Sequence, residues 1–393
     1  MNTHVVNPGP GPLFGPDFSS FRADEVAWLL ADYTELNLEA DIGQREADIQ
    51  SGRAHYADDL PREATPTAEY MSLFDAALQR NAPAVASAVA SAADDLRGRL
   101  STEDIVLVSL ARAGVPAGIW LKHRLATTHE TRTHHYAISI VRDRGIDLHA
   151  LAWIAAHHDV GTVVFVDGWS GKGTIRRELT SALREAARIG LGFPDRFVVI
   201  ADPARVADIA GTTEDLLIPT ACLNSTSCGL VSRTVLPRGD ASASPYHGAR
   251  LYSEFSELDR SRAAVDEINA RVTAMPNRSG SASRRTPGPL PKTAWEVAER
   301  LGISDLNLIK PGFGETTRVL QRRIPWKVLV DPEWMRHPDM AHIHSLAACR
   351  GVEVLAADTW PYRCIGVIRP LRPGHAPERT QHLEATDATT TGA

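Results

Sequence analysis

Residues 162–175 read TVVFVDGWSGKGTI, an apolar run that leads into one acid and then a glycine-rich turn. The run at 163–166 predicts a buried parallel strand, and Asp167 lies where the carboxyl end of such a strand opens into a crevice. Glycines in the turn allow successive N–H groups to converge on an anion at the start of a helix, which we expect near Thr174. This stretch therefore predicts an α/β fold with a binding site for a sugar phosphate.

The turn has two competing interpretations. In a nucleotide P-loop, G-x-x-x-x-G-K-[ST], the lysine is followed by Ser or Thr, but Lys172 is followed by Gly173. An ordinary strand-to-helix turn without a ligand is the second alternative, and the sequence leaves it open.

The turn resembles that of type I phosphoribosyltransferases, in which a strand is followed by two acids and then by a turn that ends in glycine and a hydroxyl residue. Gly168 stands where the second acid usually lies, and Gly171 where that family often has a catalytic acid or threonine. The resemblance implies phosphoribosyl pyrophosphate and Mg²⁺ as ligands. Within it, the 5′-phosphate is expected on Ser170, Gly173 and Thr174. The ribose hydroxyls are expected on Asp167, which counts among the catalytic residues although classical acid/base chemistry is not expected of it.

A second loop of the same kind follows another apolar strand. Residues 104–110 (DIVLVSL) lead into ARAGVPAG before a helical stretch. In phosphoribosyltransferases the first core strand ends in a loop that wraps pyrophosphate with backbone amides. The resemblance therefore implies that Arg112, Ala113 and Gly114 bind pyrophosphate; the alternative is that Arg112 is an exposed surface charge.

A charged loop lies between these two segments. Residues 134–145 (HHYAISIVRDRG) alternate like a strand and end in a charged, glycine-terminated loop. The resemblance places a mobile catalytic loop here, in which Arg142 and Arg144 stabilise the charge that develops on the leaving group once closure excludes water. A solvated turn with a surface Arg–Asp pair is the alternative.

The elements that follow favour a parallel sheet. We expect a helix at 174–188, a strand at 197–201 and a short strand at 216–219. Strands that alternate with helices imply a sheet with helices on both faces, so the three loops described above share one edge of it.

Residues 220–234 (TACLNSTSCGLVSRT) concentrate hydroxyl, amide and thiol groups, which is typical of a site lining. We expect the acceptor substrate here, with Asn224 and Ser225 as binding residues. With several other segments, this one resembles the StiP family, whose members accompany bacterial tellurite and stress-resistance gene clusters and carry the label cysteine protease beside a phosphoribosyltransferase-like domain. The other segments are 19–21, 28–30, 55–56, 67–70 and 109–114, and the resemblance covers most of 14–270.

The protease label has its own requirements. A cysteine protease needs a thiolate that a nearby histidine activates, an Asn or Asp that orients this histidine, and an oxyanion hole. Cys222 and Cys228 are the candidate nucleophiles, with Asn224 and His247 among the candidate partners. Because Cys228 before Gly229 is also typical of a small buried residue before a turn, proteolysis is the minority interpretation.

Whole-chain composition bounds these interpretations. The chain has 393 residues, 43% of them hydrophobic, which is ample for two or three domains. A net charge of -6 argues against general coating of nucleic acid. The four cysteines form no CxxC pair, so neither a zinc site nor a disulfide framework is indicated. Because no long apolar run or signal-peptide order occurs, we expect a cytoplasmic protein without a membrane partner.

Composition also divides the chain. Residues 274–292 (AMPNRSGSASRRTPGPLPK) are rich in proline, serine, glycine and arginine, which is typical of a linker. We expect a partly helical segment at 1–60, a phosphoribosyltransferase-like domain at 61–272, a disordered linker at 273–293, a second domain at 294–372 and a disordered tail at 373–393.

The second domain resembles the Pelota RNA-binding fold and its kink-turn-binding ribosomal relatives. Residues 309–320 (IKPGFGETTRVL) carry the signature of that fold, with Gly314 in place of its asparagine. The resemblance implies that structured RNA is bound by Lys310, Gly312, Gly314, Glu315 and Arg318. A loop with Glu315 in the first turn of a helix is the alternative.

The rest of this domain predicts a small α/β/α sandwich. We expect a helix at 340–350 and strands at 327–331, 352–355 and 364–368.

The interpretation that we favour is a phosphoribosyltransferase-like enzyme that transfers ribosyl phosphate to an unknown acceptor and also binds RNA, in a tellurite or stress-resistance context. A non-catalytic module that binds ribose phosphate and RNA is the first alternative, because Gly168 and Gly171 replace residues of the active family. A cysteine protease of the StiP family is the second.

Overall fold

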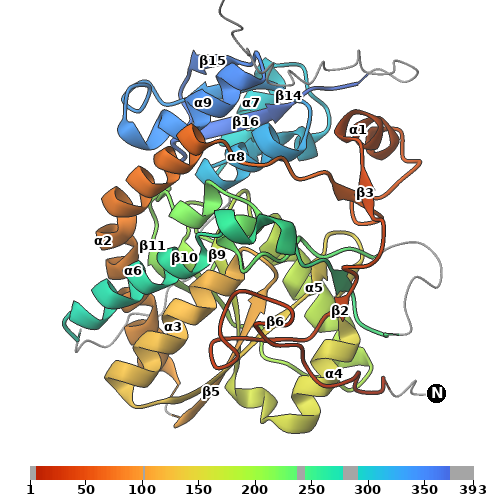
Figure 1. Cartoon of the computed structure of the whole chain (residues 1–393), viewed down its shortest axis with the longest axis vertical. Coiled ribbons are helices and arrows are strands. Elements are labelled where there is room, and N and C mark those ends of the chain that lie inside the picture. Colours follow the sequence, from red (N-terminus) through yellow and green to blue (C-terminus); the bar gives the residue numbers. More distant parts are fainter. Residues whose placement is uncertain (1–5, 101, 237–243, 278–290, 372–393) are drawn as a thin grey trace, which may run out of the picture.

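The structure, a computed structural model, describes residues 6–100, 102–236, 244–277 and 291–371. A six-stranded parallel sheet organises the first domain, residues 6–277 (Figure 1). Its strands lie in the order β1 (Ala27–Trp28), β6 (Arg132–Ile138), β5 (Asp104–Leu110), β9 (Val163–Trp169), β10 (Phe197–Ala201) and β11 (Ile209–Thr212). Neighbouring strands are parallel throughout, so the carboxyl ends of all six meet at one edge of the sheet.

The predicted α/β architecture is confirmed as a parallel sheet flanked by helices. The strands expected at 104–110, 163–166 and 197–201 are present. The prediction of a strand at 216–219 is wrong, because the sheet already ends at β11, before these residues. Pro219 instead begins a 3-10 helix (Pro219–Ala221), a position that suits proline because its missing N–H would be unpaired there.

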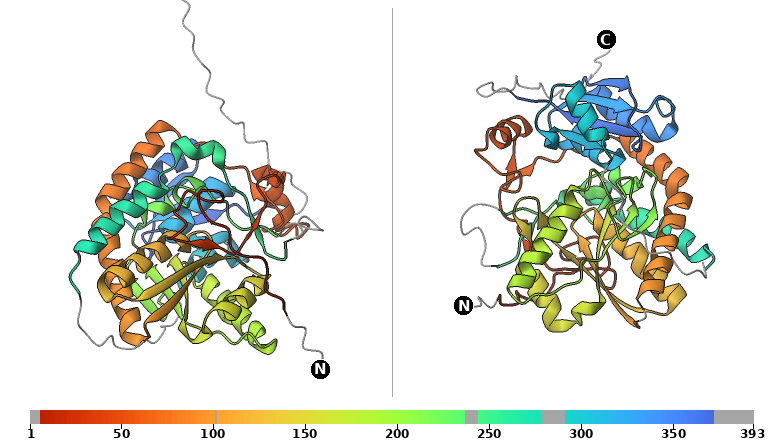
Figure 2. Two further views of the ribbon diagram at one scale, coloured as in Figure 1. Left: turned by 60° about the horizontal axis from the view of Figure 1, so that its bottom comes forward. Right: turned by 180° about the vertical axis from the view of Figure 1, so that it is seen from behind.

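Helices cover both faces of the sheet (Figure 2). Alternate side chains of β9 point to opposite faces, as in any strand: Val164 and Val166 on one, Val163 and Phe165 on the other. The first face packs against α2 (Ala68–Arg99), α3 (Gly114–His129) and α6 (Ser261–Ala274). The second face packs against α4 (Leu148–His157) and α5 (Thr174–Arg188), and α5 has the predicted bounds.

Short elements surround the carboxyl edge of the sheet. They are α1 (Ile42–Gln50), the pair β2 (Ala31–Asp32) and β12 (Gly248–Ala249), the pair β3 (Glu39–Ala40) and β4 (Leu60–Pro61), and the hairpin of β7 (Ile140–Val141) and β8 (Gly145–Ile146).

The C-terminal domain, residues 291–371, is a small mixed sheet with helices. Its sheet order is β13 (Ile309–Pro311), β16 (Cys364–Ile368), β14 (Pro325–Val330) and β15 (Glu353–Ala356), of which only β14 and β15 run parallel to each other. The helices are α7 (Thr293–Arg300), α8 (Phe313–Arg322) and α9 (Ala341–Cys349). The helix and the three strands predicted from 327 to 368 are confirmed, with ends that differ by a few residues.

The C-terminal domain packs on the first domain at the carboxyl edge of the sheet, with α8 facing the sheet and α9 beside α2 (Figure 1). One apolar core spans both domains: Phe313, Leu320 and Met340 pack in the same cluster as α2. A buried polar contact adds to it, because Asp339 Oδ1 accepts from Arg80 Nε at 2.6 Å and from Asn81 Nδ2 at 2.8 Å. The two domains therefore form one folded body.

Most of the predicted linker, at 278–290, and the predicted tail at 373–393 lie outside the described residues. Within the ranges that are described, no helix is long and apolar enough to cross a membrane.

Candidate functional site

The strand order indicates where a ligand site belongs. β5 and β9 are neighbours, and the sheet continues from β5 to β6 on one side and from β9 to β10 on the other. The chain therefore continues in opposite directions from the β5–β9 pair, which is called a topological switch point. In open α/β sheets, ligands bind at such a point, between the loops that follow the two strands. The two loops pack closely here, since a Cβ on Gly114 would lie 2.4 Å from the carbonyl oxygen of Val166, and one on Gly168 would lie 3.1 Å from that of Ala113.

Helix α8 covers the glycine-rich turn that follows β9. A Cβ on Gly314 would lie 2.2 Å from Cε2 of Trp169, and one on Gly171 would lie 3.2 Å from Cγ of Glu315. The guanidinium of Arg318 lies over the Trp169 ring, 4.7 Å from its centroid. The segment predicted to bind RNA and the turn predicted to bind phosphate therefore lie against each other.

Polar groups of the turn already have partners within the protein. Ser170 Oγ accepts from the N–H of Ala204 at 3.2 Å, and Asp167 Oδ1 accepts from the N–H of Gly168 at 2.7 Å. Lys172 Nζ donates to the carbonyl oxygen of Ile309 at 3.1 Å, across the domain contact. The turn ends as expected, with Gly173 at a φ of 75° before Thr174 opens α5.

Burial at the domain contact shifts the pKa values of several ionisable groups in the direction that favours their neutral forms. Burial raises the pKa of Asp167 to about 7, against the opposing effect of Arg318. Burial lowers the pKa of Lys172 to about 7 and that of Lys310 to about 8. Burial also raises the pKa of Asp215 to about 6, although this carboxylate accepts from two backbone N–H groups of the C-terminal domain, at Phe313 and Arg363.

Two arginines, one from each domain, converge on a single amide oxygen. Asn224 Oδ1 accepts from Arg112 Nη2 at 3.2 Å and from Arg322 Nε at 2.6 Å, and also from Arg322 Nη2. Arg112 Nη1 lies 3.7 Å from Glu63 Oε2, and the other oxygen of Glu63 accepts from both the N–H and the Oγ of Ser225 at 2.6 Å. The predicted binding residues Arg112, Asn224 and Ser225 are thus brought together.

Cys228 ends the short turn (Ser225–Ser227) that Asn224 precedes. Its thiol is 3.9 Å from Ser227 Oγ, and burial raises its pKa while Arg112, Arg322 and Arg318 act in the opposite direction. The other candidate, Cys222, is fully buried, and burial raises the pKa of its thiol strongly with Arg80 as the one opposing cation.

The remaining two cysteines have different surroundings. Cys364 is buried in the shared core, and Cys349 is exposed.

The surroundings of Cys228 are those of a closed site. Among the described residues, no histidine is hydrogen-bonded to a cysteine; the Nδ1 of His247 lies 2.8 Å from Ser139 Oγ instead. The N–H groups of Cys228 and Gly229 already donate, to the carbonyl oxygen of Ser225 at 2.9 Å and to Ser261 Oγ at 2.7 Å. An assembled cysteine protease presents an imidazole and free donors to the substrate, so this arrangement is not the assembled one.

The hairpin of β7 and β8 carries the predicted catalytic loop. Arg142 lies 5.2 Å from the ring centroid of Tyr56, and its Nη1 donates to Asn307 Oδ1 of the C-terminal domain at 3.2 Å. Arg144 is exposed. The structure therefore brings Arg142, but not Arg144, to the domain contact.

Mg²⁺ stays a prediction. Among the residues that the structure describes, no group of three or more His, Cys, Asp and Glu side chains is placed to hold a metal ion. The residue after Asp167 is glycine, so the turn offers one carboxylate where the phosphoribosyltransferase pattern has two. These residues do not fit the metal site that the resemblance implied.

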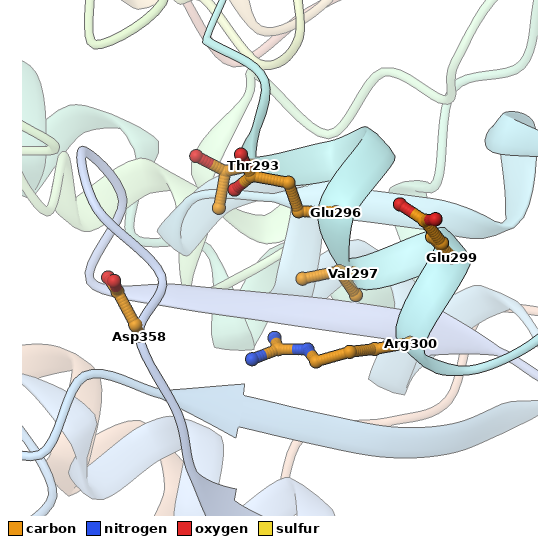
Figure 3. Close-up of a pocket in the computed structure, with 6 residues that line it drawn as sticks. All are labelled: Thr293, Glu296, Val297, Glu299, Arg300 and Asp358. Atoms are coloured by element: carbon orange, nitrogen blue, oxygen red, sulfur yellow. The ribbon is translucent and has the colours of Figure 1, made fainter.

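A surface pocket of about 300 Å³ lies elsewhere, on the C-terminal domain (Figure 3). Its polar lining includes Glu296, Glu299, Asp358 and Arg300, and it contains none of the predicted site residues. We therefore take the contact between the domains as the candidate site.

Two members of this site, Arg322 and Glu63, were not predicted from the sequence. Arg322 follows Arg318 by four residues, so the helical period could have placed both on one face of α8. Glu63 lies in an irregular segment after β4, and no local pattern marks it.

Comparison with known proteins identifies both domains. Residues 19–269 match the family described as "Tellurite-like stress resistance cysteine protease StiP", and residues 291–370 match the PELOTA RNA binding domain. A protein from Acinetobacter baylyi, named Cysteine protease StiP, is 34% identical over 372 residues, which are 90% of this chain and 95% of the relative. No solved structure matches the chain significantly.

These comparisons correct the main functional expectation. The expected phosphoribosyltransferase activity is wrong, because the matching family and the relative are both described as cysteine proteases. The structure gives a physical reason, since the turn that resembles a phosphate loop is packed under α8 and its polar groups bind other parts of the chain. The resemblance to StiP proteins and to the Pelota fold is confirmed, and the chain belongs to the StiP family of tellurite-like stress resistance cysteine proteases.

Proposed function

We propose that the chain is a cysteine protease whose nucleophile is Cys228. The observation that carries this proposal is the place of Cys228 at the end of the short turn that Asn224 precedes, since Arg112 of the first domain and Arg322 of the C-terminal domain converge on Asn224. These two arginines and Arg318 favour the thiolate. Cys222 has weaker support, because Arg80 is the one cation that favours its thiolate and Asp339 opposes it. The name of the Acinetobacter baylyi relative supports the same activity.

The proposed reaction has two steps. The Cys228 sulfur attacks the carbonyl carbon of a peptide bond, the C–N bond breaks, and the thiol proton leaves with the new amine. Water then cleaves the thioester, which releases a carboxylic acid and restores the thiol. Arg112 and its neighbours lower the cost of the thiolate in the first step.

The described arrangement is a resting state in this proposal. Helix α8 carries Arg318 and Arg322, two of the three arginines that favour the Cys228 thiolate, and it also covers the turn after β9, so in this proposal a substrate needs the helix to move. Burial keeps the thiol protonated until then.

RNA binding by the C-terminal domain is a second proposed function, supported by the match of residues 291–370. Lys310, Glu315 and Arg318 of the Pelota-like signature lie at the contact with the first domain. Backbone binding of RNA at this signature therefore requires the same movement of α8.

The finer fold assignment also remains a proposal. The strand order β6, β5, β9, β10, β11, with short loops that lead from β5 to α3 and from β9 to α5, supports a type I phosphoribosyltransferase-like sheet as a matter of fold alone.

A peptide-library digest tests the proposed activity. Wild type, Cys228→Ser and Cys222→Ser are incubated with a mixture of synthetic peptides, with and without structured RNA, and products are read by mass spectrometry. We expect cleavage that Cys228→Ser abolishes and Cys222→Ser retains. Cleavage that survives Cys228→Ser, or no cleavage by the wild type under either condition, contradicts the proposal.

A further inference from the structure

The charge around Arg322 is not balanced by the protein. Burial and the nearby cations Arg112, Arg318 and Arg233 oppose its charge, and the carboxylate of Glu63 favours it. Within the described part of the chain, no carboxylate lies within ion-pairing distance of Arg322, whereas Arg318 has Glu315 and Arg112 has Glu63. A part-buried cation without a counter-charge is costly, so the site has an excess of positive charge to offer an anion.

The geometry of the pair is that of an anion site. Arg112 and Arg322 point N–H donors from opposite domains at one atom, Asn224 Oδ1. A neutral amide oxygen compensates two guanidinium groups poorly, whereas a carboxylate or phosphate accepts such donors in charge-assisted hydrogen bonds. An anion that displaced the Asn224 oxygen would meet donors already directed at its position.

The anion site lies next to the nucleophile. Asn224 and Cys228 bound the same short turn (Ser225–Ser227), and the N–H of Cys228 donates to the carbonyl oxygen of Ser225 at 2.9 Å. Arg112 and Arg322 both favour the Cys228 thiolate. A ligand held by the arginines would therefore lie at the turn that carries the Cys228 thiol.

We propose that Arg112 and Arg322 form a subsite for an anionic side chain of the peptide substrate, beside the bond that Cys228 cleaves. The proposal rests on the proposed protease activity and adds the substrate class: peptides with Asp or Glu, or with phosphoserine, at the bound position. Because Arg322 belongs to the C-terminal domain and Arg112 to the first, such a substrate bridges the two domains. Asn224 Oδ1 lies at the position that the substrate anion would take.

Peptide binding to the uncleaving protein tests the subsite directly. Fluorescent peptides that differ at one position (Asp, Glu, phosphoserine, Asn or Ala) are titrated into full-length Cys228→Ser, and Kd is read by anisotropy. We expect the anionic peptides to bind at least about tenfold more tightly than the Asn peptide, a typical effect of a lost charge-assisted contact. The order of Asp, Glu and phosphoserine identifies the source of the anion.

Two arginine variants make the test specific. Arg322→Gln should bring the Kd of the anionic peptides to that of the Asn peptide, whereas Arg323→Gln should leave the preference intact. Arg323 is the matched control because it pairs with Glu46 of α1, at 2.7 Å from Nη2 to Oε1. Equal binding of the Asp, phosphoserine and Asn peptides would overturn the subsite, and this comparison needs no arginine variant.

The two proposals fail separately. Suppose that Cys228→Ser abolishes cleavage, while the wild type cleaves acidic and neutral peptides equally and Cys228→Ser binds them equally. This result would retain Cys228 as the nucleophile and overturn the anionic subsite. Cleavage that survives Cys228→Ser, with anionic peptides still preferred by an Arg322-dependent site, would retain the anion site and overturn its role beside this nucleophile.

Discussion

Gly314→Ala is expected to loosen the contact between the two domains. Gly314 is the second residue of α8, and a Cβ there would lie 2.2 Å from Cε2, 2.3 Å from Cζ2 and 2.5 Å from Nε1 of Trp169. Carbon atoms in good contact are about 3.5–4.0 Å apart, so the methyl group overlaps the indole by more than about 1 Å. Trp169 is a rigid ring at the end of β9 with Arg318 over one face, so α8 or the strand itself must move.

The expected cost follows from two opposing effects. Overpacking in a well-packed contact typically costs about 1–3 kcal/mol. Replacement of glycine by alanine within a helix stabilises the helix by about 1 kcal/mol. Because this overlap is with a rigid ring and not with a flexible side-chain end, we expect a net loss of about 1–2 kcal/mol in the free energy of unfolding.

Urea unfolding followed by circular dichroism measures this change. Gly98→Ala in α2 is the control, because nothing lies within 4 Å of its Cβ and the same helix preference then acts alone, giving a gain of up to about 1 kcal/mol. The double variant Gly314→Ala/Trp169→Ala removes the overlap and should lose less than the two single changes together. A Gly314→Ala protein as stable as Gly98→Ala would refute the described packing of α8 on the turn.

Three further outcomes follow from the domain contact. Burial raises the pKa of Asp167 from its ordinary 3.8 to about 7, so the folded protein holds a proton that the unfolded chain has lost; its contribution to stability is complete below about pH 4 and is lost as the pH rises through 7. Asp167→Asn should therefore reduce the fall in unfolding free energy between pH 5 and 8 by about 1–3 kcal/mol, and an unchanged pH profile would count against this shift. Asp339→Asn, which weakens the buried contact with Arg80 at 2.6 Å, should cost about 1–3 kcal/mol in urea melts, and a cost below about 0.5 kcal/mol, usual for surface pairs, would contradict its structural role. Iodoacetamide should modify Cys349 first in the native protein, with Cys228 protected until Gly314→Ala loosens α8; rapid modification of Cys228 in the wild type, read by peptide mapping, would contradict the closed site.

The sheet was predictable because its strands are local apolar runs. The segments at 104–110 and 197–201 end where the structure ends them, and α5 begins directly after the glycine-rich turn as expected. The helix α2 was not predicted, although it has 32 residues; Pro83 lies inside it, a position where proline usually interrupts a helix. The prediction of a short strand at 216–219 was wrong because an apolar tripeptide before Pro219 fits a loop as well as a strand.

The site was harder to predict because glycine is suited to every position where the backbone comes close to another group, whether or not that group is a ligand. Gly171 and Gly314 have the pattern of ligand-binding loops, yet the structure uses their missing side chains to pack the two domains together. A single sequence does not show whether such a glycine makes room for a ligand or for another part of the chain. The pair of Arg112 and Arg322 joins residues 210 positions apart in the chain, so only the folded structure brings them to one oxygen atom.

A peptide that carries an electrophile shows whether Cys228 is the nucleophile. An acidic peptide with a C-terminal chloromethyl ketone is incubated with the wild type, and the modified cysteine is located by tandem mass spectrometry, with iodoacetamide as the comparison reagent. We expect the peptide reagent to modify Cys228, Arg322→Gln to slow this reaction, and Cys349 to react equally with iodoacetamide in both proteins. Modification of Cys222 or of Cys349 without any at Cys228 would contradict this expectation.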